Sequence, residues 1–582
     1  MNLFRHLRSL LFGLLLIFLV VWIYKFELRT WVFLVVSIYF LVPAFLFRSK
    51  SLPKNRPIGS IIDPLPSKGH WALAIWIFAF VMYWAIGYFA ERGFTPNMHD
   101  EYAYIFQAET FANGKLYYPP PVHPEFFDAF HILTEKIYAS KYPPGHALIL
   151  VPGLLLGVPM LMPLLLSMGS LMVLYFWVKE IKDQDFALIS TGLLAISPLQ
   201  IQMATSYLSH STTLFFLLLF AYSLRNSFER RSLGYPVIAG IAIGIAFITR
   251  PLTAFAVASP FIFYFFFLAI RKAREGKKHG LKIISLMSLA CFPFLIIFFG
   301  YNTILMGSPL KFPWTEYTQR YMPADNFGFG LTENSRLEQL SPRKADFYQD
   351  YVQRLKRDYT FGGAIWQLLV ERLPDTLRAS DDSIGLVLFL PLAFSLPMAI
   401  YEKLMLWSVI FLFLAHFFYY GGLPRYQFEA IPFIIYFIVR GTYALLKLLK
   451  KTDGNLIRSF LVWHLLSGAI YVFSFKMLGE FNLKRDFTRY HSAFRDLVNN
   501  AGPEPKVIFV RYQPKHNYHF DLINNEPNLQ ASRNIFVLDL GGENQKLMRC
   551  FRGRSFFLFD EKAWKLEKLV LGRSPAGCSA ND

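Results

Sequence analysis

Residues 71–90 read WALAIWIFAFVMYWAIGYFA, a stretch with no charged side chain. A run of this length, folded as an α-helix, can cross the roughly 30 Å hydrocarbon core of a bilayer. Similar apolar runs recur from the N-terminus to about residue 478, and only 17% of the 582 residues are charged, against about 25% in soluble domains. The sequence therefore predicts a polytopic α-helical membrane protein.

The apolar runs predict about 13 transmembrane helices. We expect these spans at residues 10–24, 31–47, 71–90, 158–178, 185–200, 210–224, 235–249, 252–270, 283–303, 384–400, 404–420, 428–446 and 459–478. Prolines such as Pro163 and Pro260 inside these runs are tolerated in membrane helices. We expect residues 1–478 to form the membrane domain, with long outer loops at 91–157 and 304–383.

The formal net charge of +19 would be compatible with nucleic-acid binding, but its distribution along the chain argues against that partner. Lys and Arg gather in alternate short loops, for example Arg271, Lys272 and Arg274 after one span. Cytoplasmic loops of membrane proteins carry such an excess. The pattern predicts a cytoplasmic N-terminus, a C-terminal segment on the outer face and no nucleic-acid partner.

The last hundred residues differ from the rest of the chain. Short strand-like runs occur at 507–510 (VIFV), 534–540 (NIFVLDL) and 555–559 (SFFLF), and residues 543–550 and the stretch before 500 have a helical pattern. This alternation predicts a small α/β domain at 479–582. Cys550 and Cys578 either pair in an outer domain or remain two free thiols, because three cysteines do not define a disulfide framework.

The first outer loop opens with adjacent acids, Asp100 and Glu101, in the segment NMHDEYAYIF (97–106). A carboxylate just outside the membrane can act as a general base on a hydroxyl group, provided that it is ionised and reaches the proton. The structural alternative is that Asp100 caps a helix starting at Glu101. We expect that helix to place Tyr104, Ala108 and Phe111 on one face and to lie on the membrane surface.

Three cations are expected at one membrane depth on the same outer side. Lys141 precedes a stiff Pro-Pro turn in SKYPPGHALIL (140–150), Arg250 lies in FITRPLTAF (247–255), and Arg425 lies in GGLPRYQFEAIP (421–432). Ammonium and guanidinium groups suit phosphate oxygens. The structural alternatives are a lysine that extends toward lipid headgroups and a salt bridge, such as Arg425 with Glu429.

Three outer histidines, His99, His146 and His210, lack the spacing of a metal site. A hydrogen-bonding role for them is favoured over metal ligation, so we expect neither a metal site nor another cofactor. The acidic pair Asp100 and Glu101 could still hold a divalent ion.

The order of these elements resembles a known family. An acidic pair opens the first large outer loop, a KYPPGH segment closes it, and a TRP element and an RY element follow. This pattern is similar to that of the GT-C superfamily of membrane glycosyltransferases, in the family 39-like clan of protein O-mannosyltransferases and lipid A aminoarabinose transferase. The segments NTILMGSPLKFPW (302–314) and LDLGGENQKLMRCFRGRSFFLF (538–559) resemble bacterial members of that clan.

The resemblance implies a membrane-embedded transferase that uses a polyprenyl-phosphate sugar donor and inverts the anomeric centre. By matching positions, Asp100 is the base, Lys141 binds the donor phosphate, and Arg250 and Arg425 are further phosphate or carrier contacts. Tyr142, His146 and Tyr426 belong to the same elements and are expected to contact substrate. Glu101 remains an alternative base, and two spans precede the helix that leads into the acidic loop, which shifts the family's usual helix count.

The acceptor implied by the family is a hydroxyl group of a glycan, lipid or protein, and the expected location is a bacterial inner membrane. Three alternatives remain open. The first is a glycan ligase or polymerase with a lipid diphosphate donor, and the second is a transporter of lipid-linked sugars, which should carry ionisable residues near mid-span. The third is a membrane scaffold without catalysis.

Overall fold

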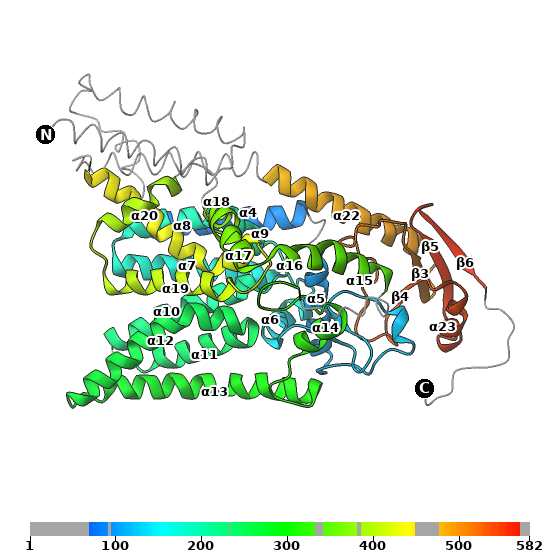
Figure 1. Ribbon diagram of the computed structural model, residues 1–582, viewed down its shortest axis with the longest axis horizontal. Coiled ribbons are helices and arrows are strands. Elements are labelled where there is room, and N and C mark those ends of the chain that lie inside the picture. The colour runs from blue at the N-terminus through cyan, green and yellow to red at the C-terminus, as the bar shows by residue number, and fades with distance from the viewer. Residues whose placement is uncertain are drawn as a thin grey trace, which may run out of the picture.

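A computed structural model describes residues 69–90, 95–230, 232–331, 341–380, 386–448 and 477–570 (Figure 1). The predicted spans at 10–24 and 31–47 lie outside these residues, as does all but the end of the span at 459–478. The described apolar helices are α4 (Gly69–Ala90), α6 (Pro144–Leu155), α7 (Leu161–Ile181), α8 (Gln184–Ile196), α9 (Pro198–Ala204), α10 (His210–Glu229), α11 (Gly234–Thr249), α12 (Pro251–Arg274), α13 (His279–Met306), α19 (Ile400–His416) and α20 (Ile431–Leu448).

Within the described residues, four helices are long and apolar enough to cross a membrane: α4, α7, α12 and α13. A fifth span results if α8 and α9 are counted as one bent element. The outward sides of these helices carry large exposed apolar residues, among them Phe255, Phe267 and Leu289. Contiguous apolar surface of this kind is matched to lipid rather than to water, so the chain is an integral membrane protein.

Two predicted spans have a different structure from the one expected. The span at 185–200 is broken where Pro198 begins a new helix, and α8 and α9 meet at a bend of 64°; proline removes a helical hydrogen bond and clashes with the preceding turn. The span at 384–400 is a 3₁₀ helix, η6 (Leu386–Ser395), that contains Pro391. With a rise of about 2 Å per residue, such an element is shorter than the bilayer core.

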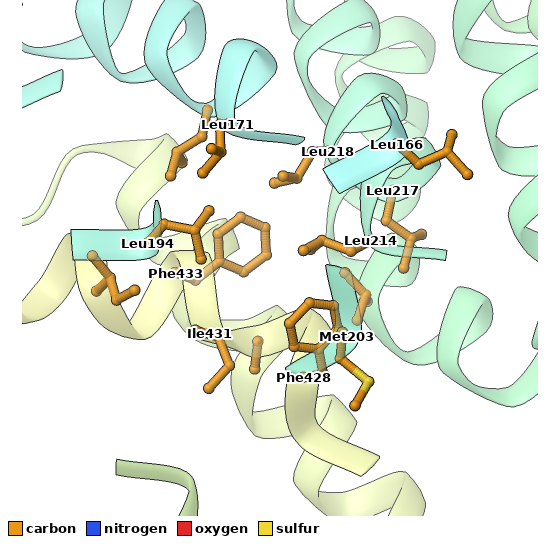
Figure 2. Packing of buried hydrophobic residues seen from close by; sticks show 14 of the residues in the cluster. Leu166, Leu171, Leu194, Met203, Leu214, Leu217, Leu218, Phe428, Ile431 and Phe433 are labelled. Atoms are coloured by element: carbon orange, nitrogen blue, oxygen red, sulfur yellow. The ribbon is translucent and has the colours of Figure 1, made fainter. Parts of the chain in front are cut away.

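The helices pack around one apolar core (Figure 2). Leu166 and Leu171 of α7 and Leu214, Leu217 and Leu218 of α10 meet side chains from the late part of the chain. The latter include Phe428, Ile431 and Phe433, which are essentially fully buried. The late helix α20 is thereby fixed against α7, α8 and α10, so segments more than two hundred residues apart share one framework.

Several short elements of the two long loops, among them α5 (His99–Ala112), α14 (Pro313–Tyr321) and α15 (Pro342–Phe347), lie between the helical core and the C-terminal sheet (Figure 1). The first loop holds α5 (His99–Ala112), η2 (Pro124–Phe126), β1 (Ile132–Leu133) and β2 (Ala139–Ser140). The second holds α14 (Pro313–Tyr321), α15 (Pro342–Phe347), η4 (Tyr348–Gln353), α16 (Arg354–Asp358), α17 (Phe361–Trp366), η5 (Gln367–Arg372) and α18 (Leu373–Ser380). The 3₁₀ helix η7 (Pro424–Ala430) leads into α20.

The tail forms a four-stranded sheet after α22 (Met477–Asn500), with strand order β4-β3-β5-β6. Its elements are β3 (Lys506–Arg511), β4 (Asn534–Leu538), η9 (Gly541–Glu543), α23 (Asn544–Cys550), β5 (Ser555–Asp560) and β6 (Lys565–Leu569). β3 runs parallel to β4 and β5, and β6 is antiparallel. The three predicted strands and both predicted helices are confirmed. Cys550 is disulfide-bonded and Cys291 is free; position 578 lies outside the described residues.

The sheet shares its core with the first outer loop. Phe126 and Phe127 are completely buried, and they pack with Val507, Phe509 and Ile535 of the sheet. Each buried phenylalanine contributes about 2 to 3 kcal/mol of apolar stabilisation. The tail and the loop that carries Asp100 are therefore packed together as one body; the domain boundary at residue 479 stays a prediction.

Candidate active site

Asp100 lies in the first turn of α5, which begins two residues earlier than expected, at His99. The residue at the N-cap is Met98, and it makes no side-chain capping hydrogen bond. The expectation that Asp100 caps this helix is therefore wrong. The reason is that Glu101 reaches back instead: its Oε2 accepts a hydrogen bond from the Asn97 amide at 2.7 Å, which leaves the Asp100 carboxylate to point elsewhere.

The Asp100 carboxylate lies beside three side chains of its own loop, His99, His131 and Tyr142. His131 Nε2 lies 3.5 Å from Asp100 Oδ1, and His99 Nε2 lies 3.9 Å from Oδ2. The hydroxyl of Tyr142 donates a hydrogen bond to Oδ1, and the Tyr142 ring stacks on Tyr104 with centroids 4.3 Å apart. The Asp100 side chain nevertheless keeps 21% of its surface exposed, so it can be reached by another molecule.

The protonation states suit a general base. Burial lowers the pKa of His99 to about 4 and the pKa of His131 well below its usual value, and the nearby Asp100 carboxylate opposes this effect at both rings. Burial alone would raise the pKa of Asp100, but the groups around it, His131, His99, Arg425 and Lys141, outweigh burial and hold that pKa well below the usual range. Asp100 is therefore ionised.

Lys141 and Arg425 are the cations of this cluster. Lys141 is 6% exposed, and its Nζ lies over the rings of Tyr317 and Tyr142, 4.9 Å and 5.4 Å from their centroids. Burial lowers the pKa of Lys141, an effect that Asp325 and Asp100 oppose. The alternative that Lys141 extends toward lipid headgroups does not fit a buried side chain that lies over these two rings.

Arg425 and Tyr426 enter the cluster from η7, at the start of the late helix. The Arg425 guanidinium donates to Met98 Sδ at 3.4 Å and lies 5.9 Å from the centroid of the Tyr426 ring. The Tyr426 ring in turn lies 5.4 Å from that of Tyr419. Electrostatic attraction connects Arg425 with Asp100. Residues separated by more than three hundred positions thus meet at one carboxylate.

Arg250 belongs to a second, adjoining group. Its Nε lies 3.7 Å from Glu429 Oε1, which also lies 3.2 Å from His210 Nδ1. The alternative of a salt bridge between Glu429 and Arg425 is therefore wrong, because Glu429 faces Arg250 and His210. Arg250 also donates to Ser209 Oγ at 3.4 Å, and this hydroxyl accepts from Tyr104 at 2.9 Å, which links Arg250 to the wall of the Asp100 site.

His146 is completely buried and both of its ring nitrogens are used. Nε2 donates to the carbonyl oxygen of Tyr207 at 2.7 Å, and Nδ1 lies 2.8 Å from Thr212 Oγ1. The ring also contacts Tyr104 edge-on at 4.8 Å. His146 thus supports Tyr104, and neither of its ring nitrogens is left to form a hydrogen bond with a substrate.

His131 was missed by the sequence reasoning. It lies 31 residues after Asp100 and precedes the short strand β1, and no motif marks it. The backbone of His131 has a positive φ of 64°, and its amide donates to the Tyr317 hydroxyl at 3.0 Å. A histidine in a loop rich in aromatic residues gives no spacing signal, so only folding shows that it adjoins Asp100.

His99, Asp100 and His131 offer three ligand atoms within 4.8 Å of one another, the one such group among the described residues. Two histidines and a carboxylate suit a transition metal. However, the buried Nδ1 atoms of both histidines have no hydrogen-bond partner, whereas metal-bound histidines usually donate from the second nitrogen. The cations Lys141 and Arg425 would also repel a divalent ion, so the residues fit a metal poorly.

The family and fold comparisons agree with the resemblance seen in the sequence. A family model for dolichyl-phosphate-mannose-protein mannosyltransferase matches residues 146–297, a segment that includes Arg250 but not Asp100. No curated protein is significantly similar to this chain in sequence.

Two solved structures are similar to this chain. ArnT from Cupriavidus metallidurans bound to undecaprenyl phosphate has 14% identity and a TM-score of 0.50, with 87% of this chain and 96% of that chain covered. The archaeal oligosaccharyltransferase AglB from Archaeoglobus fulgidus, in complex with an inhibitory peptide and a dolichol-phosphate, has 13% identity and a TM-score of 0.45. That alignment covers 81% of this chain and 65% of AglB. The chain is an integral membrane protein whose fold is similar to that of ArnT, and its residues 146–297 are similar to the dolichyl-phosphate-mannose-protein mannosyltransferase family.

Proposed function

We propose that this protein moves a sugar from a polyprenyl-phosphate donor to a hydroxyl group of a lipid, glycan or protein acceptor, with inversion at the anomeric carbon. The reaction takes place on the outer face of a bacterial inner membrane, with the N-terminus in the cytoplasm and the tail outside. The observation that carries the proposal is the ionised, partly open Asp100 carboxylate beside Lys141 and Arg425.

In this reaction, Asp100 accepts the proton of the acceptor hydroxyl as its oxygen bonds to the anomeric carbon of the sugar. The bond from that carbon to the phosphate oxygen breaks, and polyprenyl phosphate leaves with the electron pair. Negative charge grows on the leaving phosphate, so fixed cations stabilise the transition state more than the ground state. Arg425 and Lys141 supply this charge, and Arg250 is placed to contact the phosphate or the carrier behind Tyr104.

The roles of the remaining residues follow from their contacts. Tyr142 donates to Asp100 and so orients the carboxylate. Because Glu101 is 2% exposed and accepts from the Asn97 amide, it stabilises the start of α5, and we assign the base to Asp100. Tyr426 lies next to Arg425 and helps to line the phosphate side of the site. No divalent cation takes part in this scheme.

The experiment uses the full chain in lipid nanodiscs with a panel of polyprenyl-phosphate sugars and a membrane extract as the source of acceptor. Release of free polyprenyl phosphate is compared between wild type and Asp100→Asn, which keeps the shape but removes the base. Loss of one acid–base residue should lower the rate about 100-fold or more. Glu125→Gln, an exposed acid in the same loop, is the matched control and should act like wild type.

Two results would contradict the proposal. Release from diphosphate-linked but not monophosphate-linked sugars would indicate a ligase or polymerase. Movement of the donor across the bilayer without any release would indicate a transporter.

A further inference from the structure

The loop between β3 and β4 extends from the tail sheet to the Asp100 site. The His519 ring of this loop lies parallel to the His99 ring, with centroids 5.5 Å apart and an interplanar angle of 7°. His99 is itself within 3.9 Å of the Asp100 carboxylate. A residue of the tail is therefore separated from the proposed base by a single imidazole ring.

The neighbours of His519 hold it in place. Tyr518 packs edge-on against Phe347 of the second outer loop at 4.9 Å, and Phe520 stacks on Phe487 of α22 at 4.1 Å. Tyr518 and Phe520 are partly buried, whereas His519 is exposed. Tyr518 and Phe520 thus anchor the loop on either side of His519, whose ring is exposed.

An ion pair fixes the end of the same loop. Asp521 is 2% exposed, and its Oδ1 lies 2.5 Å from Arg343 Nη1. The same oxygen accepts hydrogen bonds from the Tyr512 hydroxyl at 2.8 Å and from the Ile523 amide at 3.0 Å. These contacts order the loop against the second outer loop, so the position of His519 does not depend on a substrate.

The His519 ring has the features of a contact surface. Among the described residues it contacts His99 and Tyr518, and no hydrogen bond to its ring nitrogens is present. A neutral imidazole offers one hydrogen-bond donor and one acceptor. Such a ring can stack on the apolar face of a sugar and bond to its hydroxyl groups.

Building on the transfer proposed above, we propose that this loop, residues 512–523, binds the acceptor, and that His519 positions a sugar ring of a glycan or glycolipid acceptor beside Asp100. A neutral polyhydroxylated ring stacked on the face of His519 that is turned away from His99 is not repelled by Arg425 or Lys141. Protein acceptors are usually bound along a sheet edge or in an apolar groove, and the contacts of His519 provide neither.

The test uses saturation-transfer NMR on the full chain in nanodiscs, with methyl α-D-mannopyranoside and methyl β-D-glucopyranoside as probes. Wild type should transfer saturation to the ring C–H protons of at least one probe, and His519→Ala should reduce that transfer about five-fold, as expected for loss of one stacking contact. His519→Phe keeps a flat ring and should retain most of the signal. His123→Ala, at a histidine outside the site that faces Glu125, is the matched control.

Equal saturation transfer in wild type and His519→Ala would overturn the inference. So would a signal sensitive to His519 that appears only with a threonine-containing peptide, because the acceptor would then be a protein. Polyprenyl phosphate release is measured in the same samples. If release depends on Asp100 but the saturation transfer to the glycoside is unchanged in His519→Ala, only the proposed acceptor site is wrong. If release does not depend on Asp100, the proposed function is wrong.

Discussion

Asp100 and Asp128 are both carboxylates of the first outer loop, but their neighbours differ. Asp128 is 8% exposed; its Oδ1 lies 2.9 Å from Lys344 Nζ, and its Oδ2 accepts from Ser341 and lies 3.4 Å from Arg343. Asp100 has a tyrosine hydroxyl and two histidine rings as its nearest neighbours. Its cations, Lys141 and Arg425, are held by aromatic rings and a thioether instead of by the carboxylate.

The charges around Asp128 stabilise the fold, whereas those around Asp100 leave hydrogen-bonding atoms free for another molecule. The charges around Asp128 neutralise one another directly, and burial of Asp128 is outweighed by Lys344 and Arg343, which lower its pKa to about 2. The cluster around Asp100 can still form hydrogen bonds, because the Nδ1 atoms of His99 and His131 are buried without hydrogen-bond partners. Unpaired buried polar groups destabilise a fold, and they are expected where a substrate supplies the missing contacts.

The largest expected effect breaks the structural cluster. Arg343→Met removes the cation shared by Asp128 and Asp521 and leaves two buried carboxylates short of a partner, which should lower the free energy of unfolding by about 3 kcal/mol or more. The measurement is the thermal unfolding midpoint in nanodiscs. Arg271→Met, at an exposed ion pair with Glu275, is the control and should barely change it. An unchanged midpoint for Arg343→Met would mean that the cluster does not hold the tail to the outer loops.

The next effect concerns geometry in the catalytic cluster. Arg425→Lys keeps the charge but loses the planar fork that binds two phosphate oxygens, and we expect kcat/KM for the donor to fall about 30-fold with little loss of stability. Arg357→Lys, at an exposed position of the second outer loop, is the control. A variant with wild-type kcat/KM would show that Arg425 does not bind phosphate through two bonds.

A smaller effect appears in the pH profile. Because burial lowers the pKa of Lys141, its charge is present at low pH and is lost as the pH rises through that lowered value. The basic limb of kcat/KM should therefore lie below about 10.5, the usual pKa of lysine. Lys141→Arg stays charged and should move the limb to higher pH. If the limb is the same in both proteins, Lys141 does not carry it.

The smallest effect is expected from metal removal. Since Lys141 and Arg425 flank the only candidate ligand group in the described part of the chain, treatment with EDTA should change the transfer rate less than about two-fold. The check compares EDTA-treated protein with and without added Mn²⁺ or Mg²⁺. Loss of transfer that either ion restores would contradict the assignment of Lys141 and Arg425 as the phosphate ligands.

Much of the fold followed from the sequence because apolar run length and strand-like runs are local signals. The helices α10, α11 and α12 and the strands β3, β4 and β5 lie where they were expected. The bend at Pro198 and the 3₁₀ helix around Pro391 were not expected. They depend on how the backbone accommodates a proline, which the length of an apolar run does not indicate.

The site was predictable only in part. Asp100, Lys141 and Arg425 could be named because each belongs to a short motif that the sequence predicts on the same membrane side. His131 and His519 could not, since their relation to Asp100 arises from loops 31 and more than four hundred residues away. The partner of Glu429 could not be named from sequence proximity either, since that proximity suggested Arg425 as the alternative while the fold brings Arg250 to it.

The most direct test of Asp100 as the base separates binding from chemistry. The affinity for undecaprenyl phosphate and the rate of sugar transfer are measured for wild type and Asp100→Asn in the same nanodiscs. Our account predicts that the variant binds undecaprenyl phosphate at least as tightly as wild type, because a negative charge near the phosphate is removed, while transfer falls about 100-fold or more. Transfer at the wild-type rate, or binding lost in parallel with transfer, would contradict it.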